Sequence, residues 1–257
     1  MPPLSTASDV ADFRLGVLML DTRFPRPVGD IGNPRTFPFE VIYRTVPRAM
    51  VSTVMTDDGL APDLLDRFLT EAERLERDGA DLITTGCGFL IRHQDDLATS
   101  VGVPVVASSL CLLPWLASRD HASIGVITYD ARMLKPEEFA VDVPLVIEGI
   151  ESGKELHPVI RDDRRTLDEA AARADVRDAA ERLARRMTAP TAVVLECTNL
   201  APYRDDIAAV VNCPVYDIRD PILWYAHFLA GDDTPWPELH DWLTGANFAV
   251  APQEDAG

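Results

Sequence analysis

The chain has 257 residues, of which 47% are hydrophobic and 26% charged, and its formal net charge at pH 7 is −18. This length allows one large or two modest globular domains, while the acidic balance argues against nucleic acid or an anionic membrane as a partner. No apolar run approaches the length of a membrane span, and the polar, proline-bearing first dozen residues do not resemble a signal peptide, so we expect a cytoplasmic protein with free thiols.

Four short β-rich runs mark the first half of the chain as a set of strands. Their nearly continuous apolar character is typical of parallel strands that are covered on both faces. Between the second and third runs, the segment Pro62–Arg77 has its apolar residues on one helical face and ends just before Gly79, which predicts a helix. The predicted strands of this half are Leu15–Leu20, Val51–Met55, Leu82–Thr85 and Val103–Ala107.

A loop dense in proline and glycine, Phe24–Pro38, follows the first predicted strand. The carboxyl end of a strand is where α/β proteins place ligand contacts, and Asn33 in this loop is therefore a candidate substrate-binding residue. A stiff, extended connector without a ligand role accounts for the same composition. The sequence leaves these two interpretations equally open.

The second half repeats the alternation of strand and helix. A long helix, Thr166–Met187, is predicted to open with a capping box formed by Thr166 and Glu169. Strands that alternate with helices imply parallel sheets of the doubly wound type. The predicted strands of this half are Ser123–Thr128, Pro144–Glu148, Ala192–Leu195 and Pro214–Ile218.

The two halves carry the same landmarks, which indicates a tandem duplication. The run that opens at Gly16 reads like the run that opens at Gly125. Cys87 and Cys197, each at the end of a strand-like run, are 110 positions apart (197 − 87). We therefore predict two similar α/β domains, the first made of residues 14–119 with 221–250 and the second of residues 120–220, between loose tails at 1–12 and 251–257.

Cys87 and Cys197 are the strongest candidates for chemistry. A cysteine at the turn from a strand into a helix meets free backbone amides and the positive end of the helix dipole, which both favour the thiolate. A lone cysteine in such a run is more often a small buried hydrophobic residue. Two cysteines at equivalent positions of duplicated halves instead indicate two thiols on opposite sides of one cleft, where one removes a proton from a carbon and the other returns one.

Other polar and sulfur-bearing residues are weaker candidates. Asp21 follows the first strand and would lie near Cys87, but closing a turn explains it equally well, and for its counterpart Asp130 the turn or cap role is favoured. No CxxC pair or His-rich spacing predicts a metal site. We interpret the remaining candidates as solvated helix faces (Asp95, Asp96, Asp205 and Asp206) or as structural cysteines (Cys111 and Cys213).

Residues 14–230 resemble the aspartate/glutamate racemase superfamily. The motifs that carry the resemblance are Thr85-Gly86-Cys87, Glu196-Cys197-Thr198-Asn199 and the pair Asp21-Thr22. The resemblance implies two flavodoxin-like halves related by a pseudo-twofold, with a cysteine from each half at their interface and no cofactor. Members of this family are often dimers, so the resemblance also allows a homodimer, for which no feature of the sequence marks an interface.

The chain departs from the amino-acid racemases within these motifs. Gly88 and Phe89 follow the first cysteine where the glutamate- and aspartate-specific members carry Asn-Thr, which grips the amino-acid carboxylate. Asn199 stands where those members have a titratable His or Glu, and Glu196 replaces a glycine. The thiol pair is thus retained while the grip on the substrate is altered, and Phe89 favours a larger or less polar substrate.

The sequence and the resemblance together favour a cofactor-independent racemase or epimerase that moves the α-proton of a small carboxylate or carbonyl compound, such as an amino-acid derivative. Cys87 and Cys197 would accept and donate the proton, while amides and polar side chains stabilise the enolate-like charge. The candidate substrate-binding residues are Asp21, Thr22, Asn33, Thr85, Gly88, Phe89, Thr128, Thr198 and Asn199. A decarboxylase or cis–trans isomerase of a small diacid that uses the same cysteines, and a non-catalytic small-molecule binding protein, are the alternatives.

Overall fold

The computed structural model describes residues 10–56, 59–119, 123–139, 141–187, 191–236 and 238–244. Within them the chain forms two four-stranded sheets, and every strand pairs in parallel with its neighbours. The first sheet has the order β2-β1-β3-β4, with β1 at Arg14–Leu20, β2 at Glu40–Val46, β3 at Leu82–Thr85 and β4 at Val105–Val106. The second has the order β6-β5-β7-β8, with β5 at Ile124–Thr128, β6 at Leu145–Gly149, β7 at Ala192–Leu195 and β8 at Val215–Tyr216.

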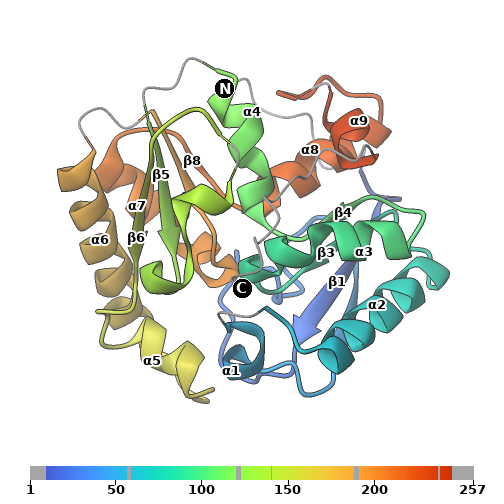
Figure 1. The fold of residues 1–257 in the computed structure, drawn as a ribbon, viewed down its shortest axis with the longest axis horizontal. Coiled ribbons are helices and arrows are strands. Elements are labelled where there is room, and N and C mark those ends of the chain that lie inside the picture. Colours follow the sequence, from blue (N-terminus) through green and yellow to red (C-terminus); the bar gives the residue numbers. More distant parts are fainter. Residues whose placement is uncertain are drawn as a thin grey trace, which may run out of the picture.

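Both sheets place their first strand between the second and the third, so the two halves share one strand order. The prediction of an α/β protein with two similar parallel sheets is therefore confirmed. In Figure 1, α2 (Pro62–Arg77) and α3 (Gln94–Ser100) lie on the outer flank of the first sheet, and α6 (Glu169–Arg186) lies on the outer flank of the second. Beside α6 packs α7 (Arg204–Val211). The pseudo-twofold relation between the halves stays a prediction.

Shorter helices connect these units. Two 3₁₀ helices, η1 (Gly88–His93) and η5 (Thr198–Tyr203), follow the third strand of each sheet and begin directly after a cysteine. No helix in the described part of the chain is long and apolar enough to cross a membrane. The other helices are α1 (Val51–Val54), η2 (Ser109–Leu112), α4 (Leu113–Ala117), η3 (Ala131–Met133), η4 (Pro136–Glu138), α5 (Leu156–Arg161), α8 (Arg219–Leu229) and α9 (Leu239–Thr244).

The helix predicted at Pro62–Arg77 forms with those bounds. Pro62 occupies the first turn, where its missing N–H has no partner to lose. The apolar face of α2 buries Phe68 and Leu75 in a cluster that also contains Leu18 and Ile83 from the first sheet. The periodic burial of one face thus decides where this helix lies, as the spacing predicted.

The strand predicted at Val51–Met55 is wrong, because that segment contains helix α1 and the missing strand is β2. β2 is an edge strand of the first sheet, and only its last residue, Val46, is buried. Its side chains are mostly half-exposed and do not form an apolar run, so the sequence pattern does not indicate a strand there. The apolar residues of Val51–Met55 have a different use, since Val51 and Met55 line a pocket.

The predicted capping box of the long helix is also wrong. Helix α6 begins at Glu169, and its N-cap is Asp168, whose carboxylate accepts hydrogen bonds from the backbone N–H groups of Ala170 and Ala171. Asp168 is preferred because it lies directly before the first helical residue and satisfies two free amides at once. Thr166 lies outside the helix.

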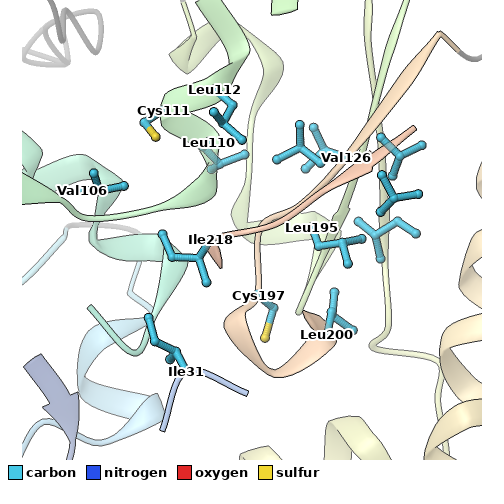
Figure 2. Packing of buried hydrophobic residues seen from close by; sticks show 14 of the residues in the cluster. Ile31, Val106, Leu110, Cys111, Leu112, Val126, Leu195, Cys197, Leu200 and Ile218 are labelled. Atoms are coloured by element: carbon cyan, nitrogen blue, oxygen red, sulfur yellow. The ribbon is translucent and has the colours of Figure 1, made fainter. Parts of the chain in front are cut away.

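Most buried apolar side chains belong to one cluster that runs from the second sheet into the first half. Figure 2 shows part of it, with Leu195 and Leu200 close to Cys197, and Val106 and Ile31 of the first half in the same view. Because this core continues through both halves, side-chain packing holds the two cysteine turns at a set distance from each other.

The last helices contribute an aromatic cluster. The ring of Trp115 contacts the rings of Tyr216, Trp224 and Trp236, which joins α4, β8 and α8. The division into domains of 14–119 with 221–250 and of 120–220 stays a prediction. Residues 120–122 at its boundary, and both predicted tails apart from residues 10–12, lie outside the described residues.

Candidate active site

Both candidate cysteines lie where a buried strand turns into a 3₁₀ helix. Cys87 precedes η1 and Cys197 precedes η5, each with extended backbone angles. Cys87 is half-buried and Cys197 is buried. Figure 2 shows the Cys197 side chain on the turn between its strand and the following coil. The two cysteines come from different sheets and line the same pocket.

This pocket is narrow and mainly apolar, and its free space, part of which is open to solvent, is about 360 Å³. Its apolar wall consists of Leu20, Phe24, Val51, Met55, Phe89 and Ile160. The polar groups are the two thiols with Arg26, Tyr129, Glu196 and Asn199, and the backbone of Gly86 and Gly88 completes the wall. Such a lining suits a small ligand with an apolar body and few charges.

The two cysteine turns interlock at the pocket. The hydroxyl of Thr198 donates a hydrogen bond to the carbonyl oxygen of Gly86, at 3.0 Å. Gly88 in turn lies against Glu196, so that a Cβ atom on Gly88 would be 2.2 Å from its carbonyl oxygen and 2.3 Å from Oε1. The two contacts are equivalent under the internal repeat, in which 86 corresponds to 196 and 88 to 198. Each contact joins the residue after one cysteine to the residue before the other.

The proline-rich loop reaches the site, since Phe24 and Arg26 line the pocket, and its role in ligand binding stays a prediction. Asp30 in this loop is buried and accepts a hydrogen bond from Nδ2 of Asn199, at 2.6 Å. It also pairs with Arg26, at 3.0 Å, and the Arg26 guanidinium lies over the ring of Phe24. The thiol of Cys197 donates to Oδ1 of Asn199, at 3.5 Å. A chain of polar contacts therefore runs from the loop to the second cysteine.

Glu196 is a buried carboxyl at the inner wall of the pocket. Its Oε2 atom accepts hydrogen bonds from the Thr128 hydroxyl, at 2.7 Å, and from the Tyr129 N–H, at 3.4 Å. Its Oε1 atom has no hydrogen-bond partner among the described residues. Burial raises the pKa of Glu196 to about 7, because a carboxylate loses its hydration there.

The thiolates expected at the two turns are not the resting state. Burial raises the pKa of Cys87 to about 12 and that of Cys197 well above its ordinary value, and the nearby Glu196 carboxyl acts in the same direction. The backbone amides of Phe89 and Asn199 lower both pKa values, as predicted from the helix starts, but burial outweighs them. Both thiols are protonated in the free protein at neutral pH.

Several predicted site residues support the pocket without being part of its lining. The hydroxyl of Thr22 accepts a hydrogen bond from Arg26. The hydroxyl of Thr128 donates to the carboxylate of Glu196, and that of Thr198 donates to the carbonyl oxygen of Gly86. Thr85 donates to the carbonyl oxygens of Ala107 and Cys87.

Two other predicted residues lie farther out. Asp21 is exposed and accepts a hydrogen bond from the N–H of Arg48, at 3.3 Å. Asn33 donates to the carbonyl oxygen of Arg26 and lines a neighbouring hollow beside Arg173 and Tyr203. Asp130 caps η3 through the N–H of Arg132, in agreement with the cap role favoured for it.

The residues that the sequence did not indicate are Arg26, Asp30, Tyr129 and the apolar wall apart from Phe89. Tyr129 directly follows β5, at the same sheet edge as Glu196, so the strand-end rule that found the cysteines could have found it. Arg26 and Asp30 carry no periodic signal, because an irregular loop positions them. The described residues contain no group of three or more His, Cys, Asp or Glu that could hold a metal ion.

Two curated proteins with similar sequences are both named dimethylsulfoniopropionate lyase. No family model matches the chain. It is 33% identical over 236 residues to dimethylsulfoniopropionate lyase 7 of Emiliania huxleyi, which covers 84% of this chain and 68% of that protein. It is 30% identical over 258 residues to dimethylsulfoniopropionate lyase of Durusdinium sp. clade D, which covers 94% of this chain and 82% of that protein.

Solved structures share the fold at low sequence identity. Unliganded arylmalonate decarboxylase aligns with a TM-score of 0.54 and 16% identity, covering 86% of this chain and 94% of that one. Allantoin racemase from Klebsiella pneumoniae gives 0.55 and 15%, over 94% and 100% of the two chains. Aspartate racemase from Picrophilus torridus gives 0.55 and 14%, over 89% and 99%. These similarities establish the fold.

Proposed function

The chain belongs to the family of the dimethylsulfoniopropionate lyases, within the aspartate/glutamate racemase superfamily, and from this premise we propose that it is a lyase that eliminates a β-leaving group from a small carboxylate. Dimethylsulfoniopropionate, a propionate with a sulfonium group on its β-carbon, is the first candidate substrate. The observation that carries the proposal is that two strand-end cysteines, one from each sheet, line a single narrow pocket.

The reaction needs one base beside the α-carbon. A cysteine thiolate removes the α-proton, the double bond between the α- and β-carbons forms, and the bond from the β-carbon to sulfur breaks with its electron pair leaving on sulfur. The products are dimethyl sulfide and acrylate, and the proton remains on the cysteine until solvent accepts it. Both cysteines line the pocket, so a cysteine of either half is a candidate for this base.

The buried thiols must lose a proton before they act as bases. A cation next to a thiol lowers its pKa, because the positive charge stabilises the thiolate. A substrate that brings a sulfonium group into the pocket therefore activates the cysteine on binding. Arg26, which Asp30 and Thr22 hold in place, is the candidate partner for the substrate carboxylate.

The presence of two thiols also favours a second candidate. A racemase or epimerase removes the same α-proton with one thiol and returns a proton to the opposite face with the other. Elimination requires only one of the two as base, so the two functions differ in how they depend on the second cysteine.

Assays of the reduced protein and of Cys87→Ala and Cys197→Ala test both candidates. With dimethylsulfoniopropionate we expect dimethyl sulfide in the headspace and acrylate in the proton NMR spectrum, and a loss of at least about 100-fold in rate for the variant that lacks the base. The other variant should keep a larger share of activity. Absence of both products, together with α-deuterium exchange into a chiral carboxylate in D2O, would favour the racemase instead.

A further inference from the structure

Among the described residues that line the pocket, only Arg26 and Glu196 have charged side chains, and Glu196 has no counter-charge among them. Arg26 pairs with Asp30 at 3.0 Å. Glu196 is 1% exposed, and no Lys, Arg or His of the described residues forms an ion pair with it. Arg92 is near enough to lower its pKa, but the guanidinium of Arg92 is bonded to Glu138 and to the carbonyl oxygens of Thr56 and Met133.

An unpaired carboxylate in a buried site costs free energy unless a proton or a cation neutralises it. The orientation of Glu196 is well determined, because Thr128 and the Tyr129 N–H hold Oε2. Its other oxygen, Oε1, lies against Gly88 at the first cysteine turn without any donor. Below its pKa a proton neutralises Glu196, and above it a positive group beside the carboxylate would do so.

We propose that Glu196 determines specificity by supplying the counter-charge for a fixed cation on the substrate, a sulfonium or quaternary ammonium group. This inference rests on the proposed function and adds to it the reason for a charged leaving group. Phe89 and Tyr129 line the same pocket, and aromatic rings attract such cations. Arg26 would thus bind the carboxylate of the substrate, and Glu196 would bind its cation.

A pair of ligands that neither thiol can cleave by the proposed reaction separates charge from shape. Trimethylammonioacetate carries the cation on its α-carbon, where β-elimination cannot expel it, and 3,3-dimethylbutanoate has the same shape with carbon in place of nitrogen. Calorimetry should show that the wild-type protein binds the cation at least about tenfold more tightly. Glu196→Gln keeps the size of the side chain and should remove most of this preference while leaving the affinity for the neutral ligand nearly unchanged.

A matched control is Glu71→Gln, which changes a buried carboxylate of α2 that pairs with Arg74 outside the pocket. It should keep the wild-type preference. The proposal would be overturned if Glu196→Gln weakened the binding of both ligands equally, or if it left the preference for the cationic ligand unchanged. The same holds if the wild-type protein does not prefer the cation. Because binding is measured without turnover, these results are independent of whether dimethylsulfoniopropionate is cleaved.

A measurement on the wild-type protein covers the case in which Glu196→Gln does not fold. The preference for the cation should increase as pH rises through the pKa of Glu196, because only the carboxylate attracts it. The groups that face Glu196 from the packed elements are Cys87, Cys197, Tyr129 and Arg92, and in the free protein burial keeps both thiols and the phenol protonated throughout that range. Because a bound cation lowers the pKa of a nearby thiol, the same titration is made on Cys87→Ala and Cys197→Ala, which should keep the pH dependence if Glu196 causes it. A preference that does not change with pH would contradict the proposal.

Discussion

At the turn after Cys87, the chain has no room for a side chain. A Cβ atom on Gly88 would lie 2.2 Å from the carbonyl oxygen of Glu196 and 2.3 Å from its Oε1 atom. Since one of these atoms belongs to the backbone, the contact cannot be relieved by turning a side chain. Gly88 and Glu196, two separate departures from the racemase motifs, are therefore one feature of the pocket.

Gly88→Ala tests this contact. We expect a loss of about 1–3 kcal/mol in the free energy of unfolding and a large loss of activity, because the two cysteine turns must separate to admit the methyl group. Urea unfolding and turnover measure the two effects. Gly102→Ala is a suitable control, since its Cβ would meet only the end of the Glu76 side chain. Equal behaviour of the two variants would show that the turns are not tightly packed.

The raised pKa of Glu196 has a consequence for stability. Burial raises this pKa from 4.5 to about 7, so between those pH values the folded protein holds a proton that the unfolded chain has lost. The free energy of unfolding should therefore be highest below pH 4.5 and fall by roughly 3 kcal/mol as pH rises to 7, for this group alone. Comparing urea unfolding of the wild type with that of Glu196→Gln across this range isolates the effect. Parallel curves would contradict it.

At the scale of elements, the long helix α6 depends on one cap. Asp168 accepts hydrogen bonds from two backbone N–H groups of the first turn, whereas Thr166 precedes the helix. Apolar periodicity predicted that this helix exists, but the cap depends on which residue is extended directly before the first turn. The N-terminal residues of a helix are decided by such local geometry.

Asp168→Ala should lower the free energy of unfolding by about 1 kcal/mol, because two amides lose their acceptor. Thr166→Ala should have almost no effect. Both are measured by urea unfolding at neutral pH, with activity as a check that the pocket is unchanged. A larger effect of the threonine variant would show that Thr166, and not Asp168, caps the helix.

At the scale of the whole molecule, the site depends on both halves of the chain, because each contributes residues to the pocket. Cys87 belongs to the first sheet and Cys197 to the second, and the pocket between them is also lined by the loop after β1 and by α1. The hydrogen bond from Thr198 to Gly86 is a direct link between the two turns. Loss of this link should affect the site more than the fold.

Thr198→Val removes that hydrogen bond at nearly constant volume. It leaves the carbonyl oxygen of Gly86 without this donor, so we expect a loss of about 1–3 kcal/mol in stability together with reduced turnover. The control is Thr191→Val, because Thr191 donates to the carbonyl oxygen of Ser123 within one half. It should lower stability without lowering turnover. Equal effects on turnover would show that the link between the turns is not needed for the reaction.

The sequence by itself determined the fold class, most strands, the bounds of α2 and the two cysteines at strand ends. Each of these is written in a local pattern: an apolar run, a helical spacing, or a motif repeated at a constant offset. The edge strand β2 was missed because its exposed side chains carry no such pattern.

Only the tertiary structure decided the contents of the pocket and the charge state of its groups. Asp30 meets Asn199, and Gly88 meets Glu196, across distances of more than one hundred residues in the chain. The same burial that brings the thiols together also keeps them protonated, although their helix starts favour thiolates. Desolvation depends on every atom that surrounds a group, and no local stretch of sequence contains that information.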